Sequence, residues 1–224
     1  MENKIVIFDW GGVIMNKYPE INNDREAIIR TIKSFNFGLN DDEAWSIYLE
    51  TLLDENGIYI SRQNDEQSKE KWVDRIKQLG NFKMTTEEFE NRFSEEHLKV
   101  GYHKEVVEYA HSLKKKCKIG LFSDLIYACY PALDKQVDLS KFDYVWLSYQ
   151  THLRKNTEEA FALVEKELKM MPRDIMFIDD TSKNIENAKK RGWNTCQAIG
   201  SEFEMIKRYV DNFLSRDKSE EFER

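Results

Sequence analysis

The stretch KIVIFDWGG, residues 4–12, decides the fold class of this chain. Its apolar part, Ile5 to Phe8, is short and rich in β-branched side chains, which is typical of a buried parallel strand. A carboxylate, Asp9, and a glycine pair, Gly11-Gly12, end the run. We therefore expect a strand whose end delivers Asp9, a candidate nucleophile, to an open crevice where ligands bind.

The second half of the chain repeats this pattern with four more short apolar runs: Ile119 to Phe122, Tyr144 to Leu147, Ile175 to Ile178 and Thr195 to Ile199. Amphipathic stretches such as Thr157 to Met170 separate these runs, with apolar residues at the spacing of one helix face. The alternation predicts an α/β fold with a doubly wound, five-stranded parallel sheet of the Rossmann type.

Residues 16–101 follow helical periods instead, and their longest strand-like run is only Ile58 to Ile60. Thr85 and Glu88 form a capping-box pattern, which predicts the start of a helix. The segment is therefore expected to be a helical insert. Three apolar stripes at helical spacing support this interpretation: Ile28, Ile32 and Phe35; Trp45, Tyr48 and Leu52; and Trp72, Ile76 and Leu79.

These patterns divide the chain into a Rossmann-like core, residues 1–15 and 102–215, and a helical cap, residues 16–101. The tail, residues 216–224, has too little apolar surface to offset the entropy of ordering, and we expect it to fray. A chain of 224 residues can build one core and carry such an insert without splitting into two independent units.

Composition excludes several classes of protein. The formal net charge of -7 argues against a general binder of nucleic acid, which needs a basic face. The cysteines are odd in number and form no metal-like pair, which favours free thiols in a reducing compartment. No apolar run approaches the roughly 20 residues needed to cross a bilayer. We expect a soluble, cytoplasmic protein with no membrane partner, and its oligomeric state stays open.

Polar groups follow four of the expected strands: Asp9, Ser123-Asp124, Lys155 and Asp179-Asp180. The carboxyl ends of parallel strands face one crevice, so these groups can converge. A carboxylate can attack phosphorus, a hydroxyl and an ammonium can hold phosphoryl oxygens, and a second carboxylate can bind Mg2+. Each residue alone is more often a helix cap, a turn residue or a solvated side chain.

The order of these groups resembles the four motifs of the haloacid dehalogenase superfamily, in its phosphatase branch. The matching stretches are FDWGGVI at residues 8–14, LFSD at 121–124, RKN at 154–156 followed by Phe161, and FIDDTSKNI at 177–185. The helical insert lies where type-1 caps of this superfamily lie. The resemblance covers essentially the whole chain, and it extends to a bacterial branch of sugar-1-phosphate phosphatases.

The resemblance implies a mechanism and its residues. Asp9 would be the nucleophile that forms an aspartyl-phosphate, and Lys155 would neutralise charge on both the phosphate and Asp9. Ser123 would bind a phosphoryl oxygen, and Asp124 and Gly11 would join it in binding the substrate. The substrate would be a small phosphorylated metabolite, with a sugar phosphate as one candidate.

The same resemblance implies a magnesium cofactor. Asp9 and Asp180 would ligate Mg2+, with the backbone carbonyl of Gly11 as a further ligand. Asp179 would support the metal site indirectly. It would either reach the ion through a water molecule or orient Lys155. Positioning and charge neutralisation would then lower the repulsion between an anionic carboxylate and an anionic phosphate.

Gly11 departs from the family pattern, because relatives usually carry a second aspartate at that position to protonate the leaving group. Loss of such an acid removes a factor of about 10²–10⁴ in rate. Two alternatives therefore stay open: a hydrolytic 2-haloacid dehalogenase, whose halide needs no proton, and a non-catalytic protein that binds a phosphorylated ligand. In the cap, Arg62 is a candidate for a second anionic group of the substrate, although a solvated arginine is the simpler interpretation.

Overall fold

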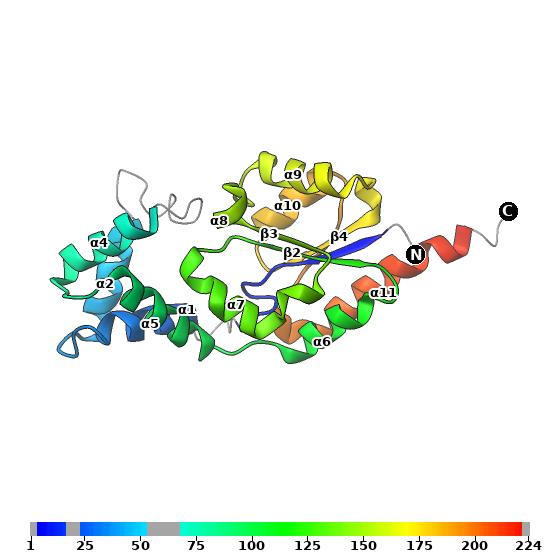
Figure 1. Ribbon diagram of the computed structural model, residues 1–224. Coiled ribbons are helices and arrows are strands. Elements are labelled where there is room, and N and C mark those ends of the chain that lie inside the picture. The colour runs from blue at the N-terminus through cyan, green and yellow to red at the C-terminus, as the bar shows by residue number, and fades with distance from the viewer. Residues whose placement is uncertain (1–3, 17–22, 53–67, 221–224) are drawn as a thin grey trace.

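The computed structural model describes residues 4–16, 23–52 and 68–220, and in these the α/β fold is as predicted. One parallel sheet has the strand order β3-β2-β1-β4-β5, which is the doubly wound arrangement (Figure 1). Its strands are β1 Ile5–Phe8, β2 Lys118–Ser123, β3 Tyr144–Leu147, β4 Ile175–Asp179 and β5 Asn194–Gln197.

Helices surround this sheet and form the insert after β1. The insert holds α1 Asn23–Lys33, α2 Asp41–Leu52, α4 Ser68–Gly80 and α5 Thr86–Leu98. The core holds α6 Lys104–Leu113, α7 Tyr130–Val137, α8 Ser148–Thr151, α9 Glu158–Leu168, α10 Ser182–Lys190 and α11 Phe203–Glu220. Short 3₁₀ helices are η1 Tyr127–Cys129, η2 Leu139–Lys141, η3 Pro172–Asp174 and η4 Gly200–Glu202.

The side chains of successive strand residues enter two separate hydrophobic clusters, because they alternate across the sheet. Val6 and Phe8 join the cluster shared with α6, α7 and α11, while Ile5 and Ile7 join the cluster under α9 and α10. Figure 1 shows these two groups of helices on opposite faces of the sheet. All four side chains of β1 are fully buried, as expected for the central strand of a parallel sheet.

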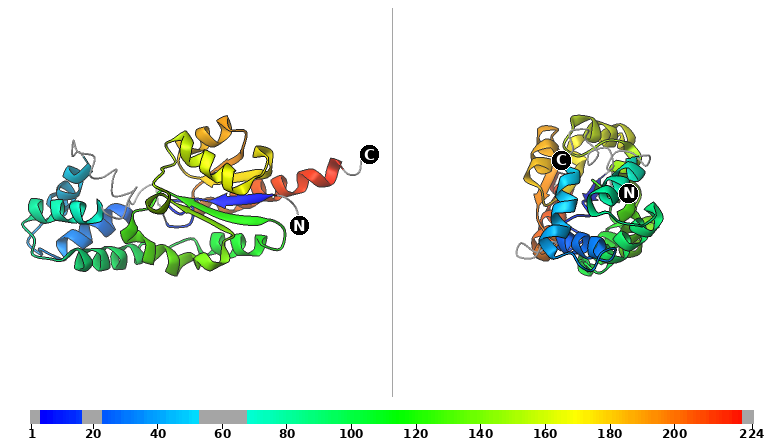
Figure 2. Two further views of the ribbon diagram at one scale, coloured as in Figure 1. Left: turned by 45° about the horizontal axis from the view of Figure 1, so that its top comes forward. Right: turned by 90° about the vertical axis from the view of Figure 1, so that its left-hand side faces the viewer.

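The insert helices α1, α2, α4 and α5 form a cap beyond the carboxyl ends of the strands (Figure 2). Trp72 lies at the centre of the cap and makes edge contacts with Phe89 and Phe93, at 5.3 and 5.7 Å between ring centroids. The helix at Thr86 starts with the predicted capping box, formed by Thr85 and Glu88. The cap is attached to the core by packing as well, since α5 lies against α7 and η1.

The two crossings between cap and core lie side by side. The Asn16 N–H donates to the Gly101 carbonyl at 3.2 Å, and Met15 forms a bridge with Tyr102. These contacts lie close to the expected boundaries at residues 16 and 101, and the exact division of the chain there stays a prediction. Arg62 and the run Ile58 to Ile60 lie outside the described residues.

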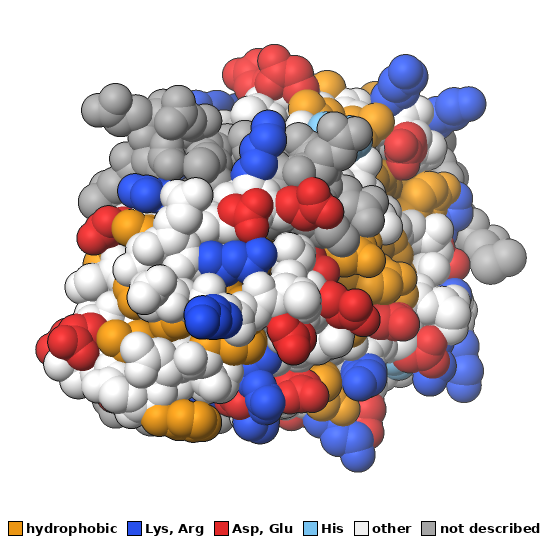
Figure 3. All heavy atoms as spheres, turned by 60° about the vertical axis from the view of Figure 1, so that its left-hand side comes forward, with side chains coloured by type: hydrophobic (Ala, Val, Ile, Leu, Met, Phe, Trp, Pro, Cys, Tyr) orange, Lys and Arg blue, Asp and Glu red, His pale blue; other side chains and the backbone are white. Residues whose placement is uncertain are grey.

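The carboxyl-terminal helix α11 continues to Glu220, past the position where the tail was expected to fray. Fraying is a property of the helix in solution, and it stays a prediction. Within residues 4–16, 23–52 and 68–220, no helix is long and apolar enough to cross a bilayer. Figure 3 looks toward the cap side, where acidic and basic side chains of the described residues alternate without forming one continuous basic surface.

Candidate active site

Strand register brings Asp9 level with the ends of β2 and β4. Phe8, the last residue of β1, pairs with Leu121 on one side and with Ile178 on the other. The Asp9 N–H continues this ladder by donating to the Ile178 carbonyl at 2.9 Å. Asp179 therefore lies beside Asp9 on the next strand, and Ser123, which ends β2, is buried on the other side.

Lys155 joins two of these strand ends. Its ammonium nitrogen Nζ lies 2.8 Å from Asp9 Oδ2 and 2.6 Å from Asp179 Oδ2. All three side chains are buried, and the ammonium also lies over the rings of Phe122 and Phe177. Long-range contacts of this kind, between residues 9, 155 and 179, are those that the motif order predicts.

The start of α10 fixes the carboxylate of Asp179. The Thr181 N–H donates to Asp179 Oδ1 at 2.8 Å, and the Asn184 side-chain amide donates to both carboxylate oxygens at 3.1 Å. Together with the Lys155 ammonium, these groups give both carboxylate oxygens of Asp179 hydrogen-bond donors. Sequence reasoning missed Asn184, although its place in the first turn after an Asp-Asp pair was a usable signal.

Asp180 completes a group of three carboxylates. Ligand oxygens of Asp9, Asp179 and Asp180 lie within 4.8 Å of one another. Gly12 makes this approach possible, because a Cβ added to it would lie 2.7 Å from the carboxylate carbon of Asp180. Gly12 also has φ +78°, which a side chain would strain.

The donor set suits a hard divalent cation. Mg2+ prefers oxygen ligands and is usually held by one or two carboxylates together with the substrate's phosphate oxygens. The Lys155 ammonium contacts Asp9 and Asp179, and a divalent ion would add further positive charge beside the three carboxylates. The predicted ligands Asp9, Asp179 and Asp180 are thus brought together, while the Gly11 carbonyl stays a prediction.

Burial, together with the neighbouring Asp179 and Asp180, raises the pKa of Asp9 from 3.8 to about 7 against the attraction of Lys155. Burial acts to lower the pKa of Lys155, but Asp9 and Asp179 outweigh it and hold the pKa above its usual value. The lysine therefore stays charged. A further cation beside Asp9 would stabilise the charged form of its carboxylate.

This pKa shift predicts a pH-dependent stabilisation by Mg2+. Because the pKa is raised on folding, the protonated Asp9 stabilises the fold at low pH, and that contribution is lost as pH rises from about 4 to about 7. Above pH 7 the charged cluster should bind Mg2+. At a concentration about 100 times Kd, the ion should raise the melting temperature by about 5–10 °C at pH 8 and by much less at pH 5.

Differential scanning fluorimetry with and without Mg2+ checks this prediction. Asp180→Asn is the matched variant, because it keeps the size of the side chain and removes its charge. A shift of equal size at both pH values, or one that persists in Asp180→Asn, would contradict a metal site at this cluster.

Two predicted substrate-binding residues have different surroundings. The Asp124 carboxylate faces the loop that carries Lys155, where Oδ1 accepts the Lys155 N–H at 2.9 Å and Oδ2 lies 3.7 Å from Arg154 Nε. Gly11, in contrast, faces open space, since a Cβ added there would have no heavy atom within 4 Å. Contact of either residue with a substrate stays a prediction.

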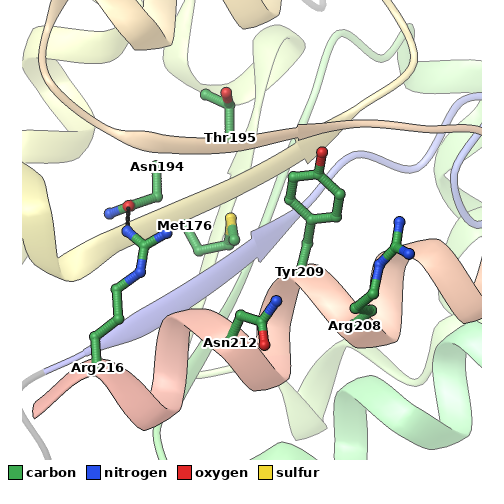
Figure 4. A pocket seen from close by; sticks show the side chains of 7 residues that line it. All are labelled: Met176, Asn194, Thr195, Arg208, Tyr209, Asn212 and Arg216. Carbon is green, nitrogen blue, oxygen red and sulfur yellow. Dashed lines mark hydrogen bonds between the residues drawn. The ribbon is translucent and has the colours of Figure 1, made fainter. Parts of the chain in front are cut away.

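A hollow in the surface lies away from these residues. A groove of about 300 Å³ lies between α11 and the end of the sheet at β5 (Figure 4). Seven residues line it: Met176, Asn194, Thr195, Arg208, Tyr209, Asn212 and Arg216. None of the predicted site residues is among them.

Comparison with known proteins agrees with the motifs. The profile of the haloacid dehalogenase-like hydrolase family matches residues 6–198. A D-ribitol-5-phosphate phosphatase of Bacteroides thetaiotaomicron is 27% identical over 208 residues, which cover 87% of this chain and 91% of that protein.

Solved structures share the fold. A haloacid dehalogenase family enzyme of Bacteroides thetaiotaomicron, in complex with magnesium and inorganic phosphate, is similar with a TM-score of 0.66 and 18% identity, over 86% of this chain and 92% of that one. An L-2-haloacid dehalogenase of Xanthobacter autotrophicus is similar with a TM-score of 0.58 and 16% identity, over 86% of this chain and 76% of that one. At these identities the likeness concerns the fold alone.

Proposed function

Because the chain belongs to the haloacid dehalogenase-like hydrolases, we propose that it is a Mg2+-dependent phosphatase acting on a small phosphorylated metabolite. One observation carries the proposal: the Lys155 ammonium lies between Asp9 and Asp179, with Asp180 beside them. A phosphatase of this kind needs a carboxylate nucleophile, a fixed cation and an acidic metal site in one place, and these residues supply all three.

In this mechanism, Asp9 and Asp180 would hold Mg2+ directly, with the Gly11 carbonyl as a third ligand and Asp179 as an indirect one. The ion would supply charge neutralisation and alignment of the phosphoryl oxygens. Asp179 would act mainly on Lys155, because its carboxylate accepts hydrogen bonds from that ammonium and from Asn184. Ser123, at the neighbouring strand end, would bind a phosphoryl oxygen.

The reaction would run in two displacements at phosphorus. First, a carboxylate oxygen of Asp9 bonds to phosphorus, and the bond from phosphorus to the leaving oxygen breaks. The leaving oxygen takes up one proton from solvent water and departs as an alcohol. Next, a second water attacks phosphorus and gives one proton back to the solvent, the bond to Asp9 breaks, and inorganic phosphate and the free carboxylate are formed. Lys155 stabilises the negative charge in both displacements.

The substrate class rests on the relative that acts on D-ribitol 5-phosphate. Its 27% identity extends over most of both chains, so sugar and sugar-alcohol phosphates are the first compounds to test. The cap would close the crevice and set the size and polarity of the substrate.

The experiment is a phosphate-release screen over sugar phosphates, sugar-alcohol phosphates, nucleotides, acyl phosphates and an aryl phosphate, with Mg2+ and with a chelator. We expect release with at least one class, and its loss on chelation. A clean, folded protein that releases no phosphate from the whole panel would contradict the proposal.

Dehalogenation is the second candidate, because Gly11 has no acidic side chain to supply a proton and a halide leaves without one. Three clustered carboxylates fit it less well, since a haloacid already carries one negative charge. Halide release from 2-haloacids in the absence of Mg2+ would favour it over the phosphatase. Tight phosphate binding without any turnover would instead favour a non-catalytic protein.

A further inference from the structure

We propose that Asp124 and Asn187 are positioning residues, whose side chains clamp the main chain of Lys155 so that its ammonium reaches Asp9. This inference rests on the proposed function for its catalytic consequence. Its geometry stands on contacts between described residues alone. Neither residue needs to touch the substrate, and Asn187 belongs to none of the motif positions that predict the site.

The clamp consists of hydrogen bonds to the backbone N–H and to the backbone carbonyl of Lys155. Asp124 Oδ1 accepts the N–H of Lys155 at 2.9 Å, and the side-chain amide of Asn187 donates to the Lys155 carbonyl at 3.1 Å. Asp124 follows β2 and Asn187 lies on α10, so two different elements grip Lys155 from its two sides. Asn187 is 9% exposed, which makes its hydrogen bond a buried one.

Asp124 is itself held in place. The next residue, Leu125, donates its N–H to Ser148 Oγ at 2.9 Å, and the same hydroxyl donates to the Leu125 carbonyl at 3.1 Å. Ser148 begins α8, directly after β3. The segment that carries Asp124, directly after β2, is therefore hydrogen-bonded to the start of α8, directly after β3.

Lys155 needs such a clamp because it lies in the loop between α8 and α9, outside every strand and helix. No sheet ladder or helical hydrogen bond fixes its backbone. The Lys155 side chain is buried and its ammonium contacts two carboxylates, so a shift of its backbone would disturb both contacts. A displacement of about 1 Å at a reacting site can cost about 10²-fold in rate.

Asn187→Ala and Asp124→Ala test the clamp. We expect each to lower kcat by about 10–100-fold with little change in KM, because the ammonium would be displaced while the substrate contacts remain. Asn194→Ala is the matched control: its amide also donates to backbone carbonyls, those of Arg173 and Ile175, but far from the site. That variant should keep the kcat of the wild type.

Asp124→Asn separates the hydrogen bond from the charge. The asparagine keeps an oxygen that can accept the Lys155 N–H, and it loses the negative charge near Arg154. We expect a loss of kcat that is smaller than the loss in Asp124→Ala, because the conservative variant can keep the hydrogen bond. A loss as large as that of Asp124→Ala would overturn the clamp, because charge would then be the property that matters.

Hydrogen exchange of the Lys155 amide gives a readout that needs no turnover. It should become faster in Asp124→Ala and stay unchanged in Asn194→Ala. If the wild type releases no phosphate, the proposed function fails, and exchange alone decides the clamp: an unchanged Lys155 amide overturns it. A raised KM with unchanged kcat in Asp124→Ala would also overturn it, since that pattern marks direct substrate contact.

Discussion

Asp9→Asn should lower kcat by about 10⁴-fold or more on every phosphorylated substrate of the wild type. The amide is uncharged and a poor nucleophile, so the first displacement at phosphorus loses its attacking group. The fold should survive, because asparagine has the same size and its oxygen can still accept the Trp10 N–H that Asp9 Oδ1 accepts at 2.7 Å. Steady-state phosphate release, with circular dichroism as a check of folding, measures both effects.

Asp143→Asn is the matched control for this substitution. Asp143 also accepts a backbone N–H, that of Ile119 at 2.8 Å, and pairs with Lys114 at 3.2 Å. It precedes β3, at the end of the sheet away from the site, so its variant should keep the wild-type rate. Activity within tenfold of the wild type in Asp9→Asn would remove Asp9 from the chemistry.

Gly11→Asp should raise kcat on sugar-alcohol phosphates by about 10²–10³-fold, because it would install the acid that relatives carry at this position. The space for it exists, since a Cβ at Gly11 meets no heavy atom within 4 Å. An aryl phosphate should gain little, because its phenolate leaves without protonation. The comparison of the two substrates therefore reports proton donation specifically.

Gly11→Asn is the control, since it has the same size and cannot act as an acid at neutral pH. We expect it to leave both rates near those of the wild type. An equal gain in Gly11→Asn would mean that filling the space matters and not proton transfer. No gain in Gly11→Asp would mean that another group already supplies the proton.

The sheet could be predicted from the sequence because buried parallel strands are short, apolar and nearly free of polar residues. β1 and β3 have the expected bounds, since every residue in those runs is apolar or aromatic. β5 was expected at residues 195–199 and is found at Asn194–Gln197. β5 is an edge strand that contains polar residues, so the hydrophobic pattern does not show where the strand begins and ends. Its hydrogen-bonded pairing with β4 defines those ends.

The direction of side chains in loops could not be predicted in the same way. The expected contact of Asp124 with the substrate stays a prediction, whereas the hydrogen bond that its carboxylate accepts from the Lys155 N–H was not predicted. That hydrogen bond joins two residues that are 31 positions apart in the sequence. It depends on the path of the loop that carries Lys155, and no local sequence pattern encodes that path. Asn187 was missed for a similar reason, because an asparagine on a helix looks like a solvated residue until the helix is packed on the sheet.

The central claim, that Asp9 bonds to phosphorus during turnover, is tested most directly by trapping the intermediate with borohydride. Reduction of an aspartyl-phosphate converts the aspartate to homoserine, which peptide mass spectrometry detects at a single position. We expect the modification at residue 9, dependent on both substrate and Mg2+. An enzyme that releases phosphate at full rate while residue 9 stays unmodified would contradict the account.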